Sequence, residues 1–396
     1  MPSKPRHPVS PPDPAAIRGV LLDWYRRCRR DLPWRAGTPS ALAGDRPDPY
    51  HVLVSEAMLQ QTQVATVIDY FHRFLGAFPT VHDLAAADEQ RVLRLWQGLG
   101  YYRRARHLHA AAKRIVDDHA GVVPDTVDAL LQLPGVGRYT AGAVASIAYD
   151  RPAAILDGNV ARVLARLHGI DDPIDAPATR DRLWALAGEL ADGESPGDVN
   201  QGLMELGATV CRPKSPACLT CPLRDHCAAA RTGRAEALPH RLPKKKPAAV
   251  THAVVAVERQ GRFLFEQRGD GGLWAGLWQL PTLQFEAEDN RNQDAALALP
   301  GWFAERHGLG IEPPRQVDSF THQTTHRTIT FVLHHAPQPA GRLNRTGPAR
   351  AWRRLDRLDD LPLANPQRKA VDLLRESVAR FSRKAAKTQR SAKKNA

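Results

Sequence analysis

Four of the five cysteines in the 396-residue sequence stand close together, in the pattern Cys211-x6-Cys218-x2-Cys221-x5-Cys227. Four thiolates within seventeen residues can enclose one metal centre. A cysteine-only ligand set with one tight pair and two wider arms favours one [4Fe-4S] cluster. Zinc remains the alternative, although common zinc sites use two paired C-x2-C knuckles. A group of cysteines that binds a metal centre instead of forming disulfides predicts that the protein is in a reducing compartment, the cytoplasm. The fifth cysteine, Cys28, falls on an apolar helical stripe and is predicted to be a buried core residue.

A glycine-rich turn lies between two segments with helical periodicity, at residues 133–138 with the sequence LPGVGR. Gly135 and Gly137 permit a tight hairpin whose backbone N–H groups face outward at a helix N-terminus. That geometry binds a phosphate without reading the base sequence. A Gly-x-Gly pattern alone is usually only a turn, but in a chain with this cysteine cluster it favours a DNA contact.

These two motifs together resemble the helix-hairpin-helix DNA glycosylases that carry an iron–sulfur cluster. Residues 32–35, 55–63, 96–102 and 156–160 narrow the resemblance to the MutY adenine DNA glycosylases, over about residues 17–380. The resemblance implies a monomeric base-excision repair enzyme that acts on double-stranded DNA. It would hydrolyse the N-glycosidic bond of adenine mispaired with 8-oxoguanine or guanine, and leave the strand intact.

Glu56 is the candidate general acid. It lies four residues after Val52 and three before Leu59, so in a helix it shares a face with apolar residues. A carboxyl group in apolar surroundings has a raised pKa, which suits proton donation. A helix glutamate is usually a surface residue. The resemblance implies instead that Glu56 protonates the adenine ring and makes the base a leaving group.

Three further residues complete the expected catalytic set. Asp157 precedes a helix, where aspartate is a preferred N-cap, and a fixed carboxylate there also suits an oxocarbenium-like sugar. The resemblance gives Asp157 that catalytic role and makes Asn159 an organising residue. Tyr139 stands where related bifunctional glycosylase/lyases have a lysine nucleophile, and a phenol cannot form a Schiff base. We therefore expect a monofunctional enzyme with Tyr139 near the sugar; a packing role for Tyr139 is the alternative.

The resemblance also implies which residues contact DNA. Trp34, Arg35 and Leu59 match positions around the flipped adenine, because the target base must leave the stack before it can react. Gln61 and Tyr102 match residues that insert into the duplex beside the lesion. For Trp34 and Tyr102, ordinary core packing is the alternative.

The composition changes along the chain and predicts a multidomain protein. Helical periodicity dominates the first half, whereas short β-branched and aromatic segments follow a linker rich in proline and lysine. The expected fold is an all-α helix-hairpin-helix glycosylase core with an iron–sulfur cluster loop, followed by an α+β Nudix-like domain. The predicted parts are a disordered N-terminus (1–14), the glycosylase region (15–230), a linker (231–249), the Nudix-like domain (250–380) and a basic disordered tail (381–396).

The C-terminal domain resembles the lesion-recognition domain of the same family at residues 262–265 and 276–281. It lacks a glutamate-rich Nudix metal motif, so we do not expect phosphohydrolase activity. Phe320, Thr321 and His322 fall where the family commonly has a Phe-Ser-His turn that senses 8-oxoguanine. Threonine keeps the hydroxyl donor and adds a methyl group.

The net charge of +13 is unevenly distributed. Residues 1–230 hold 26 basic and 26 acidic residues, and residues 231–396 hold 29 and 16. Nucleic acid is the natural partner of such a chain, and a merely solubilising tail is the alternative. No apolar run approaches a membrane span, and the N-terminus lacks a secretory signal. Two other functions stay open: a bifunctional pyrimidine DNA glycosylase/AP lyase of the same fold, and a non-catalytic DNA-damage binding protein.

Overall fold

The computed structural model describes residues 13–35, 46–243, 246–286 and 292–392. The chain divides into two compact units, which are described separately here. The first unit comprises residues 1–87 and 104–244, and the second comprises residues 88–103 and 245–396. Among the described residues, no helix combines the length and the apolar character needed to cross a bilayer.

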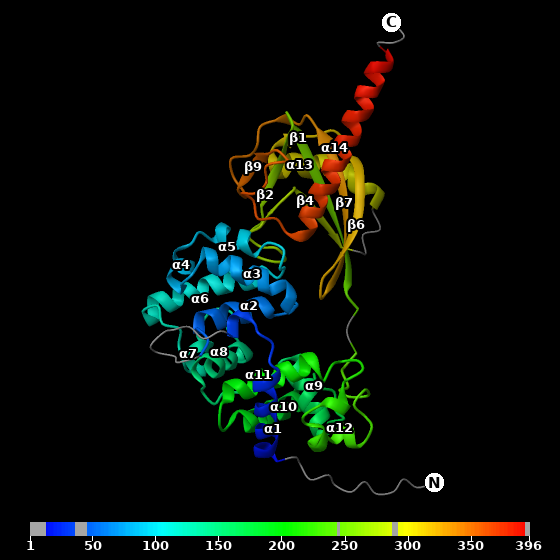
Figure 1. The fold of residues 1–396 in the computed structure, drawn as a ribbon. Helices are drawn as coiled ribbons and strands as arrows, with labels where there is room; N and C mark the ends of the chain where they lie inside the picture. The colour runs from blue at the N-terminus through cyan, green and yellow to red at the C-terminus, as the bar shows by residue number, and fades with distance from the viewer. Residues whose placement is uncertain (1–12, 36–45, 244–245, 287–291, 393–396) are drawn as a thin grey trace, which may run out of the picture. The chain divides into compact units, whose positions relative to one another are not determined.

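The described part of the first unit is helical throughout, as expected. Its helices are connected by short loops (Figure 1). They are α1 (Pro14–Cys28), η1 (Pro33–Arg35), α2 (Pro49–Leu59), α3 (Val64–Ala77), α4 (Val81–Ala86), α6 (Arg103–His119), α7 (Val127–Leu131), α8 (Arg138–Tyr149), α9 (Gly158–His168), α10 (Pro177–Ala191), α11 (Pro196–Thr209), η2 (Cys218–Thr220), η3 (Arg224–His226) and α12 (Ala228–Arg231).

Helix α1 corrects one prediction. Ile17, Leu21 and Tyr25 form its buried side. Cys28, predicted to lie in the core, is exposed. By helical spacing Cys28 continues the side of Val20 and Trp24, which are themselves only half-buried.

Local signals in the sequence explain where α2 begins. The carboxylate of Asp48 accepts hydrogen bonds from the backbone N–H groups of Tyr50 at 2.7 Å and His51 at 3.4 Å. These N–H groups have no partner inside the helix, so an aspartate at this place stabilises its first turn. Pro49 occupies the first helical position, where its missing N–H costs nothing. The start of α2 in turn fixes where Glu56 lies along the helix.

Helix α8 lies at the centre of the first unit, and close backbone approaches hold its neighbours near it. A Cβ atom on Gly142 would lie 2.1 Å from the carbonyl oxygen of Ala154. A Cβ atom on Gly207, in α11, would lie 2.7 Å from Cβ of Asn159. Both contacts are too short for any larger side chain. These glycines therefore allow α8, α9 and α11 to meet closely enough to share one site.

The predicted linker, residues 231–249, is only in part an exposed connector. Leu238 is buried, and its carbonyl oxygen accepts a hydrogen bond from Nε of Arg166 at 2.9 Å. Residues 244–245 lie outside the described residues. The first strand of the second unit, β1 (Ala248–Arg259), already begins within the predicted linker.

The second unit is built on a seven-stranded mixed sheet, in agreement with the expected α+β domain. Strands run in the order β3-β2-β1-β7-β6, with β4 paired to β1 and β9 paired to β2. The long central pair β1 and β7 is parallel, with Val250 opposite Ile329. The remaining elements are β2 (Arg262–Gln267), β3 (Trp278–Gln279), β4 (Thr282–Glu286), β5 (Leu309–Gly310), β6 (Arg315–Gln323), β7 (Arg327–Pro337), β8 (Ala340–Gly341), β9 (Arg350–Arg353), α5 (Glu89–Trp96), α13 (Asn292–His307) and α14 (Asn365–Ala392).

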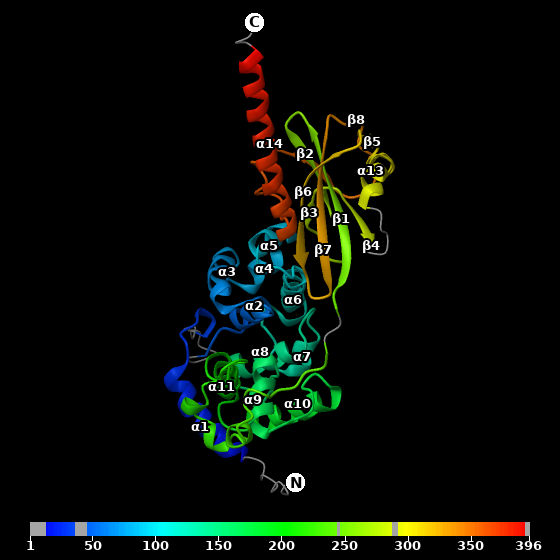
Figure 2. The ribbon, with the colours of Figure 1, turned by 90° about the vertical axis from the view of Figure 1, so that its right-hand side faces the viewer.

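One helix covers each face of the sheet, which Figure 2 shows edge-on. Successive side chains of a strand point to opposite faces, so β1 contributes to both cores. On one face, Val254 packs in a cluster with Leu374 of α14. On the other, Val255 packs in a cluster with Phe303 of α13. The sheet is therefore buried on both sides.

The two predicted disordered ends have different outcomes. Residues 1–12, most of the predicted N-terminal segment 1–14, lie outside the described residues. The predicted tail, residues 381–396, is largely helical, because α14 continues to Ala392; residues 393–396 lie outside the described residues. Alanine, lysine and arginine are strong helix formers, which explains why the helix does not stop where the apolar pattern ends.

Candidate active site

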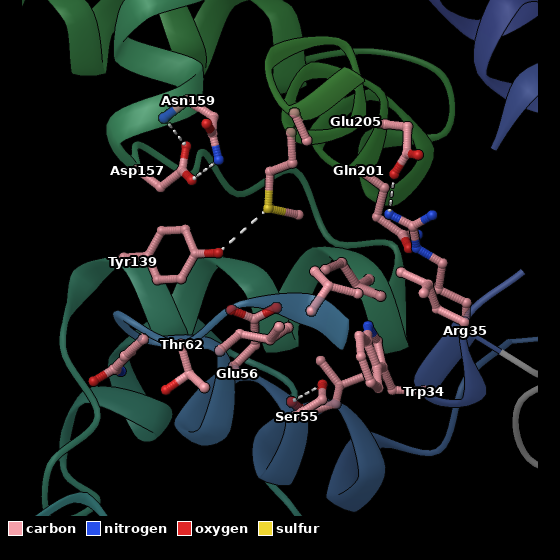
Figure 3. Close-up of a pocket in the computed structure, with 18 of the residues that line it drawn as sticks. Trp34, Arg35, Ser55, Glu56, Thr62, Tyr139, Asp157, Asn159, Gln201 and Glu205 are labelled. Atoms are coloured by element: carbon pink, nitrogen blue, oxygen red, sulfur yellow. Dashed lines mark hydrogen bonds and ion pairs between the residues drawn. The ribbon is translucent and has the colours of Figure 1, made fainter. Parts of the chain in front are cut away.

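A cavity of about 630 Å3 in the first unit brings together most of the predicted catalytic residues. Helices α2, α8 and α11 and the start of α9 form its walls (Figure 3). The predicted residues that line it are Trp34, Arg35, Glu56, Leu59, Gln61, Tyr139, Asp157 and Asn159. Residues far apart in the sequence thus converge on one space.

Glu56 lies in the last turn of α2 and is almost entirely buried. Burial is the main cause that raises its pKa to about 7; a hydrogen bond with Tyr139 and the charge of Arg35 oppose the shift, and Asp157 adds to it. The carboxyl group is therefore partly protonated at neutral pH. A group that exchanges a proton near neutral pH suits general acid catalysis.

Tyr139 stands in the first turn of α8, between the two carboxyl groups. Its hydroxyl donates a hydrogen bond to Sδ of Met204 at 3.3 Å. Burial, followed by the charges of Glu56 and Asp157, raises the pKa of Tyr139 well above its ordinary value. The residue therefore stays a neutral phenol, able to donate a hydrogen bond but not to act as an amine nucleophile.

Asp157 caps the N-terminus of α9, and the cap holds its carboxylate in place. Oδ1 accepts hydrogen bonds from the backbone N–H groups of Asn159 at 2.9 Å and Val160 at 2.7 Å. Oδ2 accepts one from Nδ2 of Asn159 at 2.9 Å. Burial raises the pKa of Asp157, and these hydrogen bonds oppose that shift. The capping role and a catalytic role are compatible, because the carboxylate still borders the cavity.

Trp34 and Arg35 line another part of the cavity. Trp34 is buried and packs edge-on against Phe71, with 5.4 Å between ring centroids. Nη2 of Arg35 lies 2.8 Å from Oε2 of Glu205, and Nε of Arg30 lies 2.6 Å from Oε1 of the same carboxylate. Although burial opposes ionisation, the two arginines lower the pKa of Glu205. The carboxylate is therefore ionised and fixed.

Sequence reasoning missed Gln201 and Glu205, both of which line the cavity. They lie four residues apart on α11 and therefore share a helical face. Both are buried, although glutamine and glutamate usually lie at the surface. The available signal was that Gln201 lies between the apolar positions Val199 and Leu203, and Glu205 between Leu203 and Leu206.

The four clustered cysteines lie together beside α9. Burial raises the pKa of Cys221 to about 12, and the nearby charges of Cys211, Cys227 and Cys218 add to this shift. The other three cysteines therefore lie near Cys221. Nη1 of Arg166 donates a hydrogen bond to Sγ of Cys211 at 3.3 Å. The residues present therefore fit a group that is bound by four thiolates.

In the part of the chain that the structure describes, no three His, Cys, Asp or Glu side chains are close enough to hold a single ion. A zinc site needs four ligands about 2.0–2.3 Å from one ion, whereas a four-iron cluster is bound by four cysteine thiolates.

The glycine hairpin has the geometry expected of a phosphate contact. Gly135 has φ +75°, and a Cβ atom there would lie 2.4 Å from Cβ of His107, so only glycine fits. Gly137 is the N-cap of α8 and supplies no capping side chain. Both glycines are exposed. Because glycine has no side chain, Gly137 cannot cap the first backbone N–H groups of α8. The helix dipole also favours an anion at this end of the helix.

The two residues predicted to insert into the duplex differ in exposure. Gln61 is exposed at the cavity, in a left-handed backbone conformation with φ 60°. Tyr102 is only 3% exposed, and its hydroxyl donates to the carbonyl oxygen of Leu363 at 3.3 Å. A side chain packed in this way is not available for insertion, which contradicts the prediction for Tyr102. The exposed aromatic of this motif is Tyr101, which is 48% exposed.

The predicted lesion-sensing turn is part of a strand. Phe320, Thr321 and His322 lie in β6 and pair with β7, with Thr321 opposite Thr330. The β-branched and aromatic residues of this segment favour a strand, and the turn follows at residues 324–326. Because side chains alternate along a strand, Thr321 faces the opposite side from its two neighbours.

Comparisons with known proteins agree with this site. A family model described as HhH-GPD superfamily base excision DNA repair protein matches residues 54–189, and a NUDIX domain model matches residues 252–373. The chain is 38% identical to an adenine DNA glycosylase of Rattus norvegicus, covering 83% of this chain and 73% of the relative. It is 32% identical to that of Buchnera aphidicola subsp. Acyrthosiphon pisum, covering 80% and 84%.

A solved structure of a thermostable thymine-DNA glycosylase is similar to 55% of this chain and 97% of its own, with 28% identity and a TM-score of 0.47. The sequence similarity to the two adenine DNA glycosylases covers 83% and 80% of this chain. The predicted fold class and resemblance are confirmed, and the chain is a hydrolase of N-glycosyl bonds that belongs to the family of adenine DNA glycosylases.

Proposed function

We propose that this enzyme removes adenine mispaired with 8-oxoguanine or guanine from double-stranded DNA and leaves an abasic site in an intact strand. One observation carries the proposal: a buried carboxyl group with a pKa near 7, Glu56, borders the same cavity as a fixed carboxylate, Asp157. A proton donor for the base and a negative charge for the sugar are the two groups that this hydrolysis requires.

In the proposed mechanism Glu56 gives its proton to a ring nitrogen of the flipped adenine. Protonation makes the base a better leaving group, so the C1′–N9 bond breaks with its electron pair moving to the base. Asp157 stabilises the resulting oxocarbenium-like sugar. A water molecule then attacks C1′ and gives up a proton to the carboxylate that Glu56 has become, which restores the acid. Asn159 keeps the Asp157 carboxylate in place through the 2.9 Å hydrogen bond from its amide.

The absence of an amine at the site supports the monofunctional assignment. The described residues that line the cavity include no lysine, and Tyr139 is a neutral phenol near both carboxyl groups. A lyase step needs an amine that forms a Schiff base with the sugar. These features disfavour the bifunctional alternative, and the paired carboxyl groups disfavour a protein that only binds damage.

Trp34, Arg35 and Leu59 are the proposed contacts of the flipped base, with Glu205 fixing the arginine. We place the phosphate contact at the backbone of Gly135 and Gly137.

Insertion into the duplex is assigned to Gln61 and to Tyr101, in place of Tyr102. The strand that contains Phe320, Thr321 and His322 is the proposed reader of the oxidised guanine. We retain residues 15–230 and 250–380 as the catalytic and recognition regions of a monomeric enzyme.

Cys211, Cys218, Cys221 and Cys227 are the proposed ligands of one [4Fe-4S] cluster. When bound, the cluster supplies rigid crosslinks to the loop at 211–227 and no proton donor. Four reduced cysteines of this kind are consistent with a cytoplasmic location.

The proposal is tested by single-turnover excision on duplexes that carry adenine opposite 8-oxoguanine, guanine or thymine. Strand scission should require added alkali. Glu56→Gln should lower excision by at least about a hundredfold, because an amide donates no acid proton, while duplex binding is kept. Asp69→Asn, an exposed carboxylate of α3, is the matched control. Spontaneous nicking with borohydride trapping, or normal excision by Glu56→Gln, would overturn the assignment.

A further inference from the structure

One side chain of the cavity contacts Tyr139 and has no role in the proposed mechanism. Met204 lies in α11, on the helical face that also carries Gln201 and Glu205, and all three line the cavity. Its thioether sulfur accepts the hydrogen bond from the Tyr139 hydroxyl at 3.3 Å. The carboxyl group of Glu56 is a second hydrogen-bond partner of the same hydroxyl. Tyr139 therefore contacts both a thioether and the proposed acid.

The phenol of Tyr139 has one proton and can donate it to only one of these two partners. In Figure 3 the Tyr139 hydroxyl and the Glu56 carboxyl group point into the same space, and a dashed line joins the hydroxyl to the sulfur atom. A thioether sulfur is a weak acceptor, whereas an ionised carboxylate is a strong one. A protonated carboxyl group is itself a donor, and the phenol oxygen can accept its proton. The protonation state of Glu56 therefore decides which partner receives the phenol proton.

From this geometry we infer that Met204 is a positioning residue for the proposed acid: its sulfur accepts the proton of Tyr139 as long as Glu56 still holds its own. While Glu56 is protonated, it donates to the oxygen of Tyr139, and Tyr139 donates to Sδ of Met204, which is the bond present in the structure. Once Glu56 is ionised, the phenol turns and donates to the carboxylate. The change costs little, because the hydrogen bond to sulfur is weak.

This arrangement favours the proposed reaction before and after the proton is transferred. Before transfer, the hydrogen bond that Tyr139 accepts stabilises the protonated form of Glu56, in addition to the burial that raises its pKa to about 7. After transfer to the base, the Tyr139 hydroxyl donates to the new carboxylate. That interaction forms only as the reaction proceeds, so it lowers the barrier. The inference deepens the proposed function and rests on it.

Other charged groups face the same cavity and also act on Glu56. The charge of Asp157 raises its pKa and that of Arg35 lowers it. The charged and titratable side chains that line the cavity, besides Glu56 and Tyr139, are Arg30, Arg35, Asp157, Arg180 and Glu205. A substitution at Met204 leaves all of these charges in place. A change in the titration of Glu56 would therefore report the hydrogen bonds of Tyr139.

The titration of Glu56 tests the inference directly. Its carboxyl carbon is followed by NMR in the full-length protein, labelled with carbon-13 glutamate and free of DNA, and is identified by its loss in Glu56→Gln. Met204→Leu keeps an apolar side chain of similar volume but removes the acceptor. We expect the midpoint to fall by about one pH unit, because the acid form loses its hydrogen-bond chain while the carboxylate keeps the phenol donor. The single-turnover rate should then fall about tenfold at pH 8 and about twofold at pH 6.

Three comparisons separate this role of Met204 from repacking of the cavity. Met58→Leu is the matched control and should leave the midpoint unchanged, since Met58 is buried in α2 and is not among the described residues that line the cavity. In a Tyr139→Phe background, Met204→Leu should not move the midpoint, because no phenol proton remains to be placed. Met204→norleucine, made in the Met58→Leu protein, replaces the sulfur by a methylene group of similar shape. It should reproduce the shift even if leucine disturbs the fold.

An unchanged or raised midpoint in the leucine and norleucine proteins would refute the inference. An equal shift in the Tyr139→Phe background would also refute it, because the effect would then not pass through the phenol. Failure of the proposed function has a different signature. In that case the full-length protein would excise no adenine, while the midpoint of Glu56, measured without DNA, would still respond to the change at Met204.

Discussion

The amide oxygen of Asn159 accepts a hydrogen bond from Nη2 of Arg162 at 2.8 Å, while the amide nitrogen of Asn159 donates to Asp157 at 2.9 Å. Nε of the same arginine donates to the carbonyl oxygen of Cys211 at 2.8 Å. One guanidinium therefore connects the first cysteine of the proposed cluster loop to Asn159, which orients the carboxylate proposed to be catalytic.

This connection predicts the effect of Arg162→Lys. Lysine keeps the charge but not the planar fork that reaches both partners, so Asn159 should lose its fixed orientation. Excision should fall by about tenfold or more, with binding of the duplex changed much less. Single-turnover kinetics and affinity are measured together. The control is Arg114→Lys, which changes an exposed arginine of α6. Equal kinetics in the two variants would contradict a role of Arg162 in orienting Asn159.

The excision rate should depend on pH through Glu56. Its pKa of about 7 means that the proton donor is lost as pH rises above 7, so the single-turnover rate should fall about tenfold per pH unit in that range. On the acidic side the rate should fall as Asp157 becomes protonated. A rate that is constant between pH 6 and 9 at saturating enzyme would show that Glu56 is not the acid.

The same carboxyl group should affect stability. Its folded-state pKa lies above the unfolded value of 4.5, so the folded protein binds the extra proton between about pH 4.5 and 7, and stability decreases as pH rises through this window. Glu56→Gln removes the free-energy cost of ionising this buried carboxyl group. The free energy of unfolding of the variant relative to the unchanged protein should therefore increase by about 2 kcal/mol from pH 5 to pH 8. Denaturant titrations at both pH values check this, and a constant difference would contradict it.

Loss of one proposed cluster ligand should weaken the fold. Cys218→Ala leaves three thiolates and opens one iron to solvent and reductant, so cluster content and thermal stability should both fall. Iron and labile sulfide are assayed beside the melting temperature. Cys28→Ala is the matched control, since that thiol is exposed and outside the group of four. Equal iron content in both variants would mean that the cysteine spacing has another purpose.

The alternation along β6 predicts unequal effects of two neighbouring substitutions. If His322 reads the oxidised guanine, Thr321 on the opposite face does not share that contact. His322→Ala should lower the preference for 8-oxoguanine over guanine by roughly tenfold, in line with one lost hydrogen bond. Thr321→Val should change it less than about twofold. Equal losses in the two variants, measured on both duplexes, would place the reading residue elsewhere.

The sequence was sufficient where a local pattern decides the structure. The cap formed by Asp48 and Pro49 and the glycine hairpin each depend on residues close in the chain, and both are present as predicted. Glu56 was found because its apolar helical neighbours already imply burial.

Predictions failed where distant packing decides. Tyr101 and Tyr102 are adjacent and chemically identical, and only tertiary contacts bury the second and expose the first. Glu205 was missed because its burial depends on arginines about 170 residues away. The tail was predicted to be disordered because it is basic and of low complexity, although its helix propensity is high.

Helical glycines are frequent targets when a protein is engineered for heat resistance, because alanine gains roughly 0.5–1 kcal/mol in an unconstrained helix. Gly207 satisfies that rule by its place in α11, yet a methyl group there would lie 2.7 Å from Cβ of Asn159. Gly207→Ala would be mild in an unconstrained helix, but here its methyl group would clash with Asn159, the residue that orients Asp157. The effect of a substitution in α11 on this enzyme therefore depends on the space between the helices, and not only on how similar the two side chains are.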